Sequence, residues 1–333
     1  MLRIIALKIL NWWRLVSDLS LSHQAELSYP EPSKQSVSTR ILNTHQAGDI
    51  SMPLRSNSLL TAITGRNRQS RSYRNLLIIL FGYFVLPIAV QAQSTDRPNV
   101  VLILADDLGY TDISPFGSEI RTPNIARLAT QGLSFTNYHT AANCAPARAM
   151  LLTGVDSHRN GVPNIPESIP PEQMAYDHYQ GVLSDKVVTL ASLLQDNGYH
   201  TYMTGKWHLG HTPSLLPSAR GFDRTIAMAD AGADNWEQRI FLPIYDQANW
   251  YADGTPHTLP DDFYSSEYFI DKAIEFIDSN ESSDQPFFAY IPFQAVHTPV
   301  QAPKEYSDRY AGVYDKGWSV MREKRRQAAI AKG

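Results

Sequence analysis

The sequence feature that most constrains the fold is a run of six apolar residues, Val100 to Ala105, that ends abruptly in Asp106 and Asp107. A continuous apolar run of this length is typical of a strand that helices cover on both faces of a parallel sheet. Open α/β sheets bind their ligands at the carboxyl ends of such strands. The run therefore predicts a buried strand over residues 100–105, with two carboxylates at the ligand-binding edge.

The same alternation of helix and strand recurs along the chain. Thr122 as N-cap, Pro123 at the first helical position and Gly132 past the end predict a helix, followed by a strand over 133–137. A second unit places a helix over 189–198, with Leu190, Leu193 and Leu194 facing inward, before a strand over 199–204. In the third unit, a helix is followed by a strand over 287–293. The apolar face of this helix consists of Phe269, Ile270, Ala273, Ile274 and Ile277. This order predicts an α/β fold whose mostly parallel sheet carries helices on both faces.

Two long segments, 155–185 and 211–262, are rich in proline and aromatic residues and are read as loops. Loops of such length in a compact domain are usually functional, so we expect them to wall a substrate site. The last stretch, 316–333, has the pattern of a basic amphipathic helix on the surface.

The beginning of the chain has a different character. Arg66, Arg68, Arg71 and Arg74 precede an apolar run over 76–90, which is typical of a secretory signal peptide. An uncleaved membrane anchor is the alternative, although the run is short and interrupted by Gly and Pro. With Met52 as a natural start, we expect residues 1–51 to be a spurious or disordered leader, 52–93 the signal peptide, and 94–333 an exported domain, periplasmic or secreted. No stable membrane association is expected after cleavage.

Charge is distributed unevenly. Of the 29 basic and 33 acidic residues, 19 basic and 29 acidic ones lie from Ser94 onward, so this part carries about ten net negative charges. Nucleic-acid binding needs a positive face, and a nucleic-acid partner is therefore disfavoured. Any anionic substrate must be held by local cations.

Cys144 is the only cysteine, so an internal disulfide is excluded and its role is packing, metal ligation or chemistry. It opens a Cys-x-Pro-x-Arg pattern, with Pro146 and Arg148, that continues into Leu152-Thr153-Gly154. A second pattern, Gly-Tyr-x-Thr-x-x-x-Gly-Lys-x-His, runs from Gly198 to His208. Together they resemble the two signatures of the formylglycine-dependent sulfatases of the alkaline phosphatase superfamily.

The resemblance extends from about Asn99 to the last residue and is similar in detail to the bacterial arylsulfatase branch, at Ala219 to Phe222 and at Phe263 to Ser266. It implies an alkaline-phosphatase-like domain that hydrolyses sulfate esters of small molecules or carbohydrates. It also implies that a maturation enzyme oxidises Cys144 to Cα-formylglycine, whose hydrate attacks sulfur with one hydroxyl. The second hydroxyl then expels sulfate, so the nucleophile regenerates itself.

The resemblance assigns roles to further residues. Ca²⁺ is the expected cation, with Asp106, Asp107 and the modified Cys144 as its ligands, since hard cations prefer oxygen. Arg148, one helical turn after Cys144, is expected to hold the hydrate at a helix start, where the dipole favours anions. The remaining expected groups are Lys206 as a charge for the sulfate, His208 as a partner of the hydrate, and His297 as acid for the leaving group.

Plainer interpretations remain open at each position. A lone buried cysteine is most often inert packing, and adjacent aspartates often only cap a turn. Lys206, His208 and His297 could be ordinary surface or loop residues. At the level of function, the alternatives are a phosphonate or phosphodiester hydrolase of the same superfamily, or a non-catalytic remnant.

The family pattern is incomplete in this chain. Two further metal ligands are expected in a Ser-Asp-Asn-Gly segment, yet no Asp-Asn-Gly occurs after His297. We therefore expect the N-terminal portion of a sulfatase domain, C-terminally incomplete, that binds the cation weakly and is poorly soluble and inactive. Trp236, Tyr245, Trp250 and Tyr251 could stack on an aryl ring or a sugar face, so the sequence does not select the ester.

Overall fold

The computed structural model describes residues 97–333. The predicted leader and signal peptide, residues 1–93, lie outside this range. Within it, no helix combines the length and the apolar character needed to cross a membrane.

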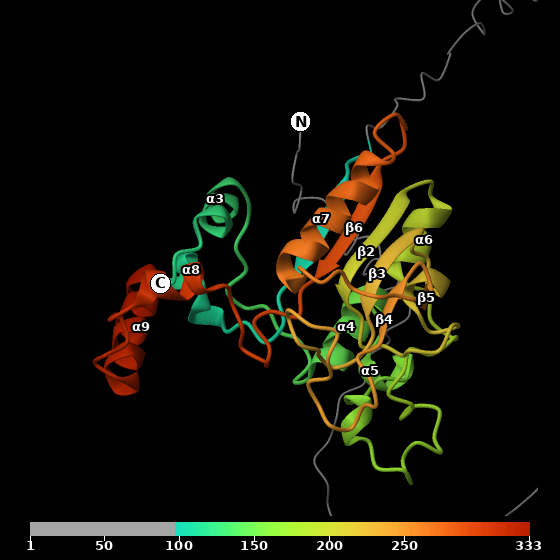
Figure 1. Cartoon of the computed structure of the whole chain (residues 1–333), viewed down its shortest axis with the longest axis horizontal. Coiled ribbons are helices and arrows are strands. Elements are labelled where there is room, and N and C mark those ends of the chain that lie inside the picture. Colours follow the sequence, from blue (N-terminus) through green and yellow to red (C-terminus); the bar gives the residue numbers. More distant parts are fainter. Residues whose placement is uncertain (1–96) are drawn as a thin grey trace, which may run out of the picture. The chain divides into compact units, whose positions relative to one another are not determined.

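A six-stranded sheet forms the centre of the described domain (Figure 1). Its spatial order is β1-β6-β2-β3-β4-β5. The first four strands in that order run parallel, whereas β4 and β5 are antiparallel additions at one side. The predicted mostly parallel sheet is therefore confirmed. The bounds are β1 Val100–Leu104, β2 His200–Lys206, β3 Arg224–Met228, β4 Trp250–Ala252, β5 Thr255–Pro256 and β6 Phe287–Pro292.

Helices lie between the strands along the chain. The three largest predicted helices are present, at 123–131, 265–278 and 318–332, and the predicted helix after Thr189 is also formed. The α-helices are α3 Pro123–Gln131, α4 Cys144–Thr153, α5 Ser157–Asn160, α6 Leu190–Asp196, α7 Ser265–Asp278, α8 Lys304–Ser307 and α9 Trp318–Lys332. Short 3₁₀ turns are η2 Tyr110–Asp112, η3 Ser114–Phe116, η4 Pro166–Ser168, η5 Pro217–Ala219 and η6 Asp308–Tyr310.

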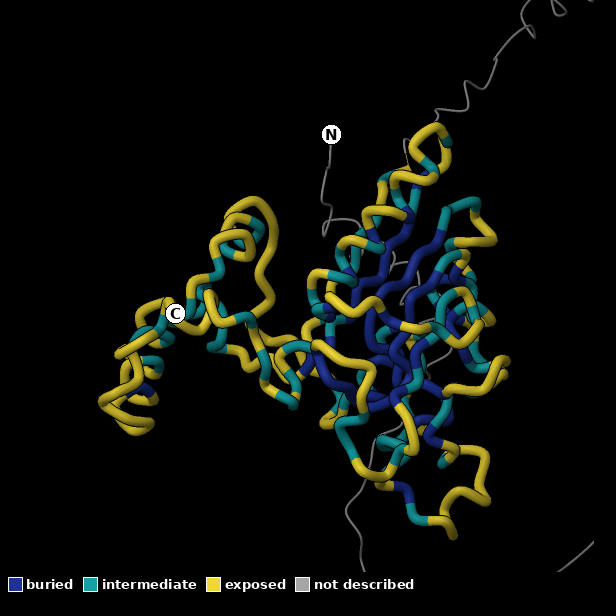
Figure 2. The backbone as a smooth tube through the Cα atoms, in the orientation of Figure 1, coloured by how far each residue is buried: buried dark blue, intermediate teal, exposed yellow. Residues whose placement is uncertain are grey.

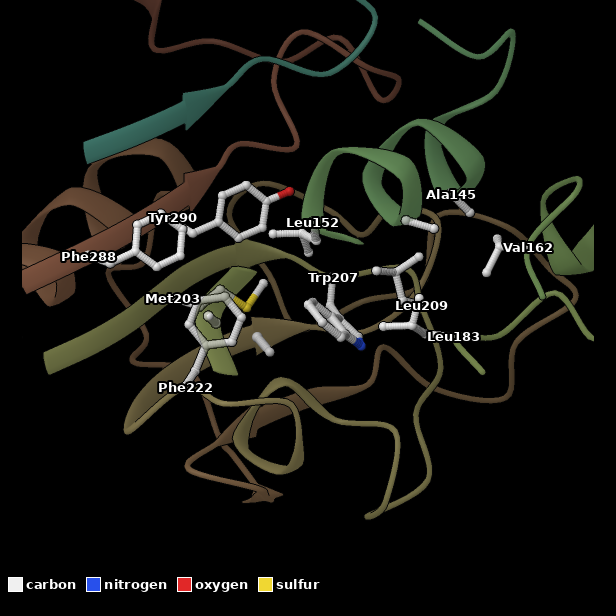
Figure 3. Packing of buried hydrophobic residues seen from close by; sticks show 13 residues of the cluster. Ala145, Leu152, Val162, Leu183, Met203, Trp207, Leu209, Phe222, Phe288 and Tyr290 are labelled. Carbon is white, nitrogen blue, oxygen red and sulfur yellow. The ribbon is translucent and has the colours of Figure 1, made fainter. Parts of the chain in front are cut away.

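Each face of the sheet has its own apolar core, because successive strand residues point to opposite sides. Met203, Phe288 and Tyr290 join Leu152 of α4 and Trp207 in the first core (Figure 3). On the other face, α7 packs on β2 and β6. There the second core contains Tyr202, Ala289, Phe269 and Phe276. Helices on both faces, as predicted, thus enclose the strands, which appear as the buried centre in Figure 2.

The prediction that β1 is covered on both faces is wrong within the described residues. Val100, Leu102 and Leu104 pack on the first core, but Ile103 points the other way and is 56% exposed. The reason is topological: β1 pairs only with β6 and forms an edge of the sheet. Its apolar run indicated a strand correctly but could not indicate its place in the sheet.

Other expectations also fail. The predicted strand over 133–137 is irregular and exposed, because the segment has no strand partner. Leu193 and Ile274 point to solvent, and Ala191 and Phe276 take the buried positions of their helices. Segment 211–262 is not a continuous loop, since it supplies β3, β4 and β5.

Two glycines allow close approaches that position the site. Gly205 in β2 has φ 145°, and a Cβ atom there would lie 2.0 Å from the carbonyl oxygen of Pro292 in β6. At Gly221, φ is 88° and a Cβ atom would lie 2.3 Å from the backbone nitrogen of Ser192 in α6. A side chain at either position would push neighbouring backbones apart.

Candidate active site

The candidate site lies where β1, β2 and β6 end. Asp106 follows β1, and its backbone N–H donates to the carbonyl of Ala295, just beyond β6. Lys206 is the last residue of β2. Parallel neighbours end at one edge of a sheet, so these side chains converge there as the sequence predicts.

A buried charge cluster forms the floor of the site. The Lys206 Nζ atom lies 2.5 Å from Asp106 Oδ2, and Arg148 Nη2 lies 3.1 Å from Asp106 Oδ1. Arg148 also donates from Nη1 to the Lys206 carbonyl, at 2.7 Å. Burial alone would raise the pKa of Asp106, but the two cations outweigh it and lower that pKa. Asp106 is therefore ionised, and the cluster keeps one net positive charge.

Cys144 lies at the first position of α4, where backbone N–H groups are unpaired. Its Sγ atom is 3.2 Å from Nδ1 of His208. Burial would raise the pKa of Cys144, yet the hydrogen bond to His208 and the charge of Lys206 bring it below its ordinary value. The cysteine therefore lies in an electropositive environment that stabilises an anion, rather than in inert packing.

The other ring nitrogen of His208 has a partner that no sequence pattern indicated. Its Nε2 atom lies 3.2 Å from Oε1 of Glu167 in η4, and the Tyr245 hydroxyl donates to the same carboxylate. Burial of His208 would lower its pKa, but the contacts with Cys144 and Glu167 raise it overall. Glu167 lies in segment 155–185, which was expected to wall the site; that location is the only sequence signal pointing to it.

A second histidine is placed more openly. His297 follows β6, and its Nε2 atom lies 3.7 Å from Oδ2 of Asp107. The Asp107 side chain is 65% exposed. At its other nitrogen, Nδ1, His297 donates to the carbonyl of Thr298, at 2.6 Å. The predicted pair of Asp107 and His297 is thus at the same edge, but in contact with solvent.

Asp107 and His208 share an unusual backbone conformation, each with φ 57°. Left-handed φ values in non-glycine residues cluster at functional sites, and Asp and His tolerate them better than most residues. Asp107 lies three residues after β1 ends, and His208 lies two residues after β2 ends.

Asp230 is a further buried acid that sequence reasoning missed. It follows β3 and is 2% exposed, with the backbone N–H of Asn249 donating to Oδ2 at 2.9 Å. Burial raises its pKa. The signal was available, since Ile226 to Ala229 form an apolar run that ends in an acid, as Val100 to Ala105 do.

The aromatic residues expected at a substrate face divide into two groups. Trp250 is 2% exposed and stacks on Phe269 in the second core. The hydroxyl of Tyr245 is engaged with Glu167, and its side chain is partly buried. Trp236, 37% exposed, and Tyr251 remain accessible. A cavity of about 460 Å³ is lined by the predicted Trp250 and Tyr251 together with polar residues, among them Gln238, Gln247, Asn249 and His257.

The residues present fit a calcium ion only in part. Ca²⁺ takes six to eight oxygen ligands. Asp106 and Asp107 are adjacent carboxylates, but both oxygens of Asp106 already face Lys206 and Arg148. Within residues 97–333, no group of three or more His, Cys, Asp or Glu side chains is arranged to hold a metal ion. The described residues alone therefore do not make a complete calcium site.

The arrangement has the parts of an anion-handling nucleophilic site. It places a nucleophile position at a helix start, with a buried ammonium and guanidinium beneath it and an imidazole in direct contact. Every residue predicted from sequence lies at this edge, the set being Asp106, Asp107, Cys144, Arg148, Lys206, His208 and His297.

Comparison with known proteins gives one consistent result. The Sulfatase family model matches residues 98–330. An uncharacterised sulfatase of Schizosaccharomyces pombe is 43% identical over 72% of this chain and 44% of its own length. For an arylsulfatase of Klebsiella aerogenes, the identity is 39% over 72% of this chain and 52% of the relative. The chain thus spans about half the length of these curated relatives.

Solved structures agree. The structure of Ps i-CgsB in complex with k-i-k-neocarrahexaose aligns with a TM-score of 0.55 and 28% identity, covering 71% of this chain and 52% of that one. The structure of BT4656 in complex with its substrate, D-glucosamine-2-N,6-O-disulfate, aligns with a TM-score of 0.52 and 25% identity over 66% of this chain and 38% of that one. The fold of the described residues is therefore shared with these solved structures.

Proposed function

The chain belongs to the sulfatase family, and we propose that it supplies the nucleophile site of an enzyme that hydrolyses sulfate esters. The observation that carries the proposal is the contact of Cys144 with His208, beside the buried Lys206 ammonium. We further propose that a formylglycine-generating maturation enzyme converts Cys144 to formylglycine. In the structure, the Sγ atom stands in for the hydroxyl oxygens of the aldehyde hydrate.

In the first step, one hydroxyl of the hydrate loses its proton to solvent and attacks sulfur, an S–O bond forms, and the bond from sulfur to the ester oxygen breaks. The leaving oxygen takes a proton from His297, which lies on the open side of the site. Lys206 and Arg148 place positive charge beneath the sulfate, where it offsets the charge of the transition state. The alcohol or phenol product then leaves.

In the second step, the remaining hydroxyl gives its proton to Nδ1 of His208. The carbon–oxygen double bond forms, the bond from that carbon to the sulfated oxygen breaks, and sulfate departs. Addition of water to the aldehyde restores the hydrate. A single thiol or serine hydroxyl lacks the second hydroxyl, so its sulfate adduct would have to be removed by water instead.

Asp106 and Asp107 are proposed as two of the ligands of a Ca²⁺ ion. When bound, such an ion would draw charge from the sulfate oxygens and lower the pKa of the hydrate. Calorimetric titration of CaCl₂ into the wild type and Asp107→Asn tests this independently of turnover. Tighter binding by the wild type supports the assignment, and equal binding contradicts it.

The substrate class and location are proposals of the same kind. A sulfated carbohydrate is favoured because BT4656 was solved with a sulfated glucosamine as its substrate. Export to the periplasm or outside the cell follows from the predicted signal peptide. A signal-peptide cleavage site mapped by N-terminal sequencing of the secreted protein tests the location.

Mass spectrometry of the peptide that contains Cys144 tests the nucleophile. After co-expression with a maturation enzyme, we expect a loss of about 18 Da relative to the thiol, since CH₂SH becomes CHO. An unmodified peptide would contradict the mechanism. Turnover of an aryl sulfate above that of the matching aryl phosphodiester supports a sulfatase, and the reverse order supports a phosphodiester hydrolase.

A further inference from the structure

Glu167 is the group in the site whose contacts are not explained by the proposed chemistry alone. Its side chain is 11% exposed, and its carboxylate lies within 3.2 and 3.3 Å of His208 Nε2 through its two oxygens. A buried carboxylate in contact with a buried imidazole is costly unless each satisfies the other. The pair therefore constrains how the ring can lie.

The contact selects one state of the ring. An acceptor at Nε2 requires a proton on that nitrogen, so a neutral His208 must leave Nδ1 as an acceptor directed at residue 144. Without Glu167, the proton could occupy either nitrogen and the ring could turn over. Carboxylate partners fix the tautomer and orientation of histidines in many sites by the same means.

The carboxylate has a second partner besides His208. The Tyr245 hydroxyl donates to Glu167, and the Tyr245 hydroxyl oxygen in turn accepts from the backbone N–H of Ala231, at 3.4 Å. On the loop before η4, Asn164 accepts from the side chain of Asn143, at 2.5 Å. Asn143 caps α4 immediately before Cys144. The segment that carries Glu167 is thus tied to the residue before Cys144 and, through Tyr245, to the backbone of Ala231.

We propose that Glu167 is a positioning residue for His208, holding the ring so that Nδ1 faces the nucleophilic atom at position 144. The catalytic consequence of this role rests on the proposed sulfatase function, whereas the orientation of the ring does not. Tyr245 supports Glu167 and does not contact the nucleophile.

Nitrogen-15 NMR of histidine-labelled protein tests the orientation directly, using the full chain with Cys144 as the thiol. We expect the wild type to give one imidazole N–H signal protected from exchange with water, assigned through its loss in His208→Ala. Glu167→Ala should abolish the signal, and Glu167→Gln should keep it, because an amide oxygen still accepts from Nε2. Glu172→Gln, an exposed position on the same loop, is the matched control and should leave the signal unchanged.

A protected signal that persists in Glu167→Ala, or that is lost in Glu167→Gln while circular dichroism shows an intact fold, would overturn the proposal. The Gln variant retains the volume of the side chain, so it remains informative if the Ala variant does not fold. Tyr245→Phe should keep the signal with faster exchange, since Glu167 then loses one of its two donors.

Kinetics then separate this inference from the proposed function. In enzyme that has Cys144 converted and a complete calcium site, Glu167→Ala should lower kcat by about 100-fold with KM within about threefold, as expected for a misplaced catalytic group. Glu167→Gln should recover most of the loss. A rise of KM by about 100-fold with unchanged kcat would contradict a positioning role. If no variant, including the wild type, hydrolyses sulfate esters while the NMR result holds, the proposed function fails and the positioning role stands.

Discussion

His208 and His297 lie at the same edge of the sheet in contrasting surroundings. His208 is 2% exposed, and each of its ring nitrogens meets a side chain from a different element, Cys144 on α4 and Glu167 in η4. His297 contacts its own neighbouring carbonyl and the exposed Asp107. The first ring is thus held by side chains from two elements, whereas the second, 16% exposed, packs edge-on against Phe241 and faces an exposed carboxylate.

The largest expected effect separates the two histidines by the step they serve. For an ester with a basic leaving group, removing either should lower kcat by about 10² to 10⁴-fold, the range for general acid–base groups. Only His208→Ala should accumulate the sulfated enzyme, because the second step then lacks its proton acceptor. Intact mass spectrometry after brief exposure to an aryl sulfate should show, in that variant, a gain of about 80 Da over the hydrate, or about 98 Da over the aldehyde, from the transferred SO₃ group.

The contrasting result for His297→Ala serves as the control. Its loss of rate should grow as the leaving group becomes more basic and nearly vanish for a nitrophenol. Accumulation of the sulfated form in His297→Ala, or its absence in His208→Ala, would break the assignment of the two rings to the two steps.

We call the buried residues of the site, Asp106, Arg148, Lys206 and His208, together with Glu167, the prepared half. The next effect concerns its stability. Asp106→Asn leaves the buried Lys206 and Arg148 facing a neutral amide, and should lower the free energy of unfolding by about 3–5 kcal/mol. Urea unfolding followed by circular dichroism measures the change. A loss below about 1 kcal/mol would mean that water reaches the charges of Asp106, Lys206 and Arg148 and screens them.

The pH dependence of the stability of the prepared half should follow the ionisation of Glu167. Burial alone would raise the pKa of Glu167, but its bonds with His208 and Tyr245 lower it to about 2. Because the folded value lies below the ordinary one, the stabilisation is fully present above about pH 4.5 and is lost as the pH falls toward 2.

The stability difference between the wild type and Glu167→Gln measures this contribution. We expect about 1–3 kcal/mol at pH 7, shrinking toward zero near pH 2. Urea unfolding at several pH values gives the difference, with Glu172→Gln as the control. A difference that stays constant with pH would show that the charge of Glu167 contributes nothing to the prepared half.

The prepared half is also the part that sequence reasoning predicted best. Asp106, Arg148, Lys206 and His208 stand at fixed distances from strand ends or a helix start, and the parallel topology then brings them to one edge. Glu167 is 41 residues from His208 in the chain. Its place depends on the path of an irregular loop, which no periodic pattern encodes.

The fold shows the same division between local and tertiary information. Val100 to Leu104 were correctly predicted as a strand, but its edge position depends on which strands pair with it. The alternating residues over 133–137 form no strand, since a strand needs a partner that the local pattern cannot supply. Conversely, β3 was missed because its five residues begin with Arg224 and Thr225, inside a stretch that reads as a loop.

The smallest effect on stability is expected in the open half of the site, which consists of Asp107 and His297. Asp107 is 65% exposed and 3.7 Å from His297, and ion pairs of this kind contribute little because water screens them. Asp107→Asn should therefore change the free energy of unfolding by less than about 0.5 kcal/mol, while Asp106→Asn, one residue earlier, costs several times more. The adjacent pair is its own matched control, since both substitutions exchange one carboxylate for an amide at the end of the same strand. A loss of several kcal/mol in the free energy of unfolding of Asp107→Asn would show that Asp107 also stabilises the fold. The difference between the surroundings of His208 and His297 would then not extend to stability.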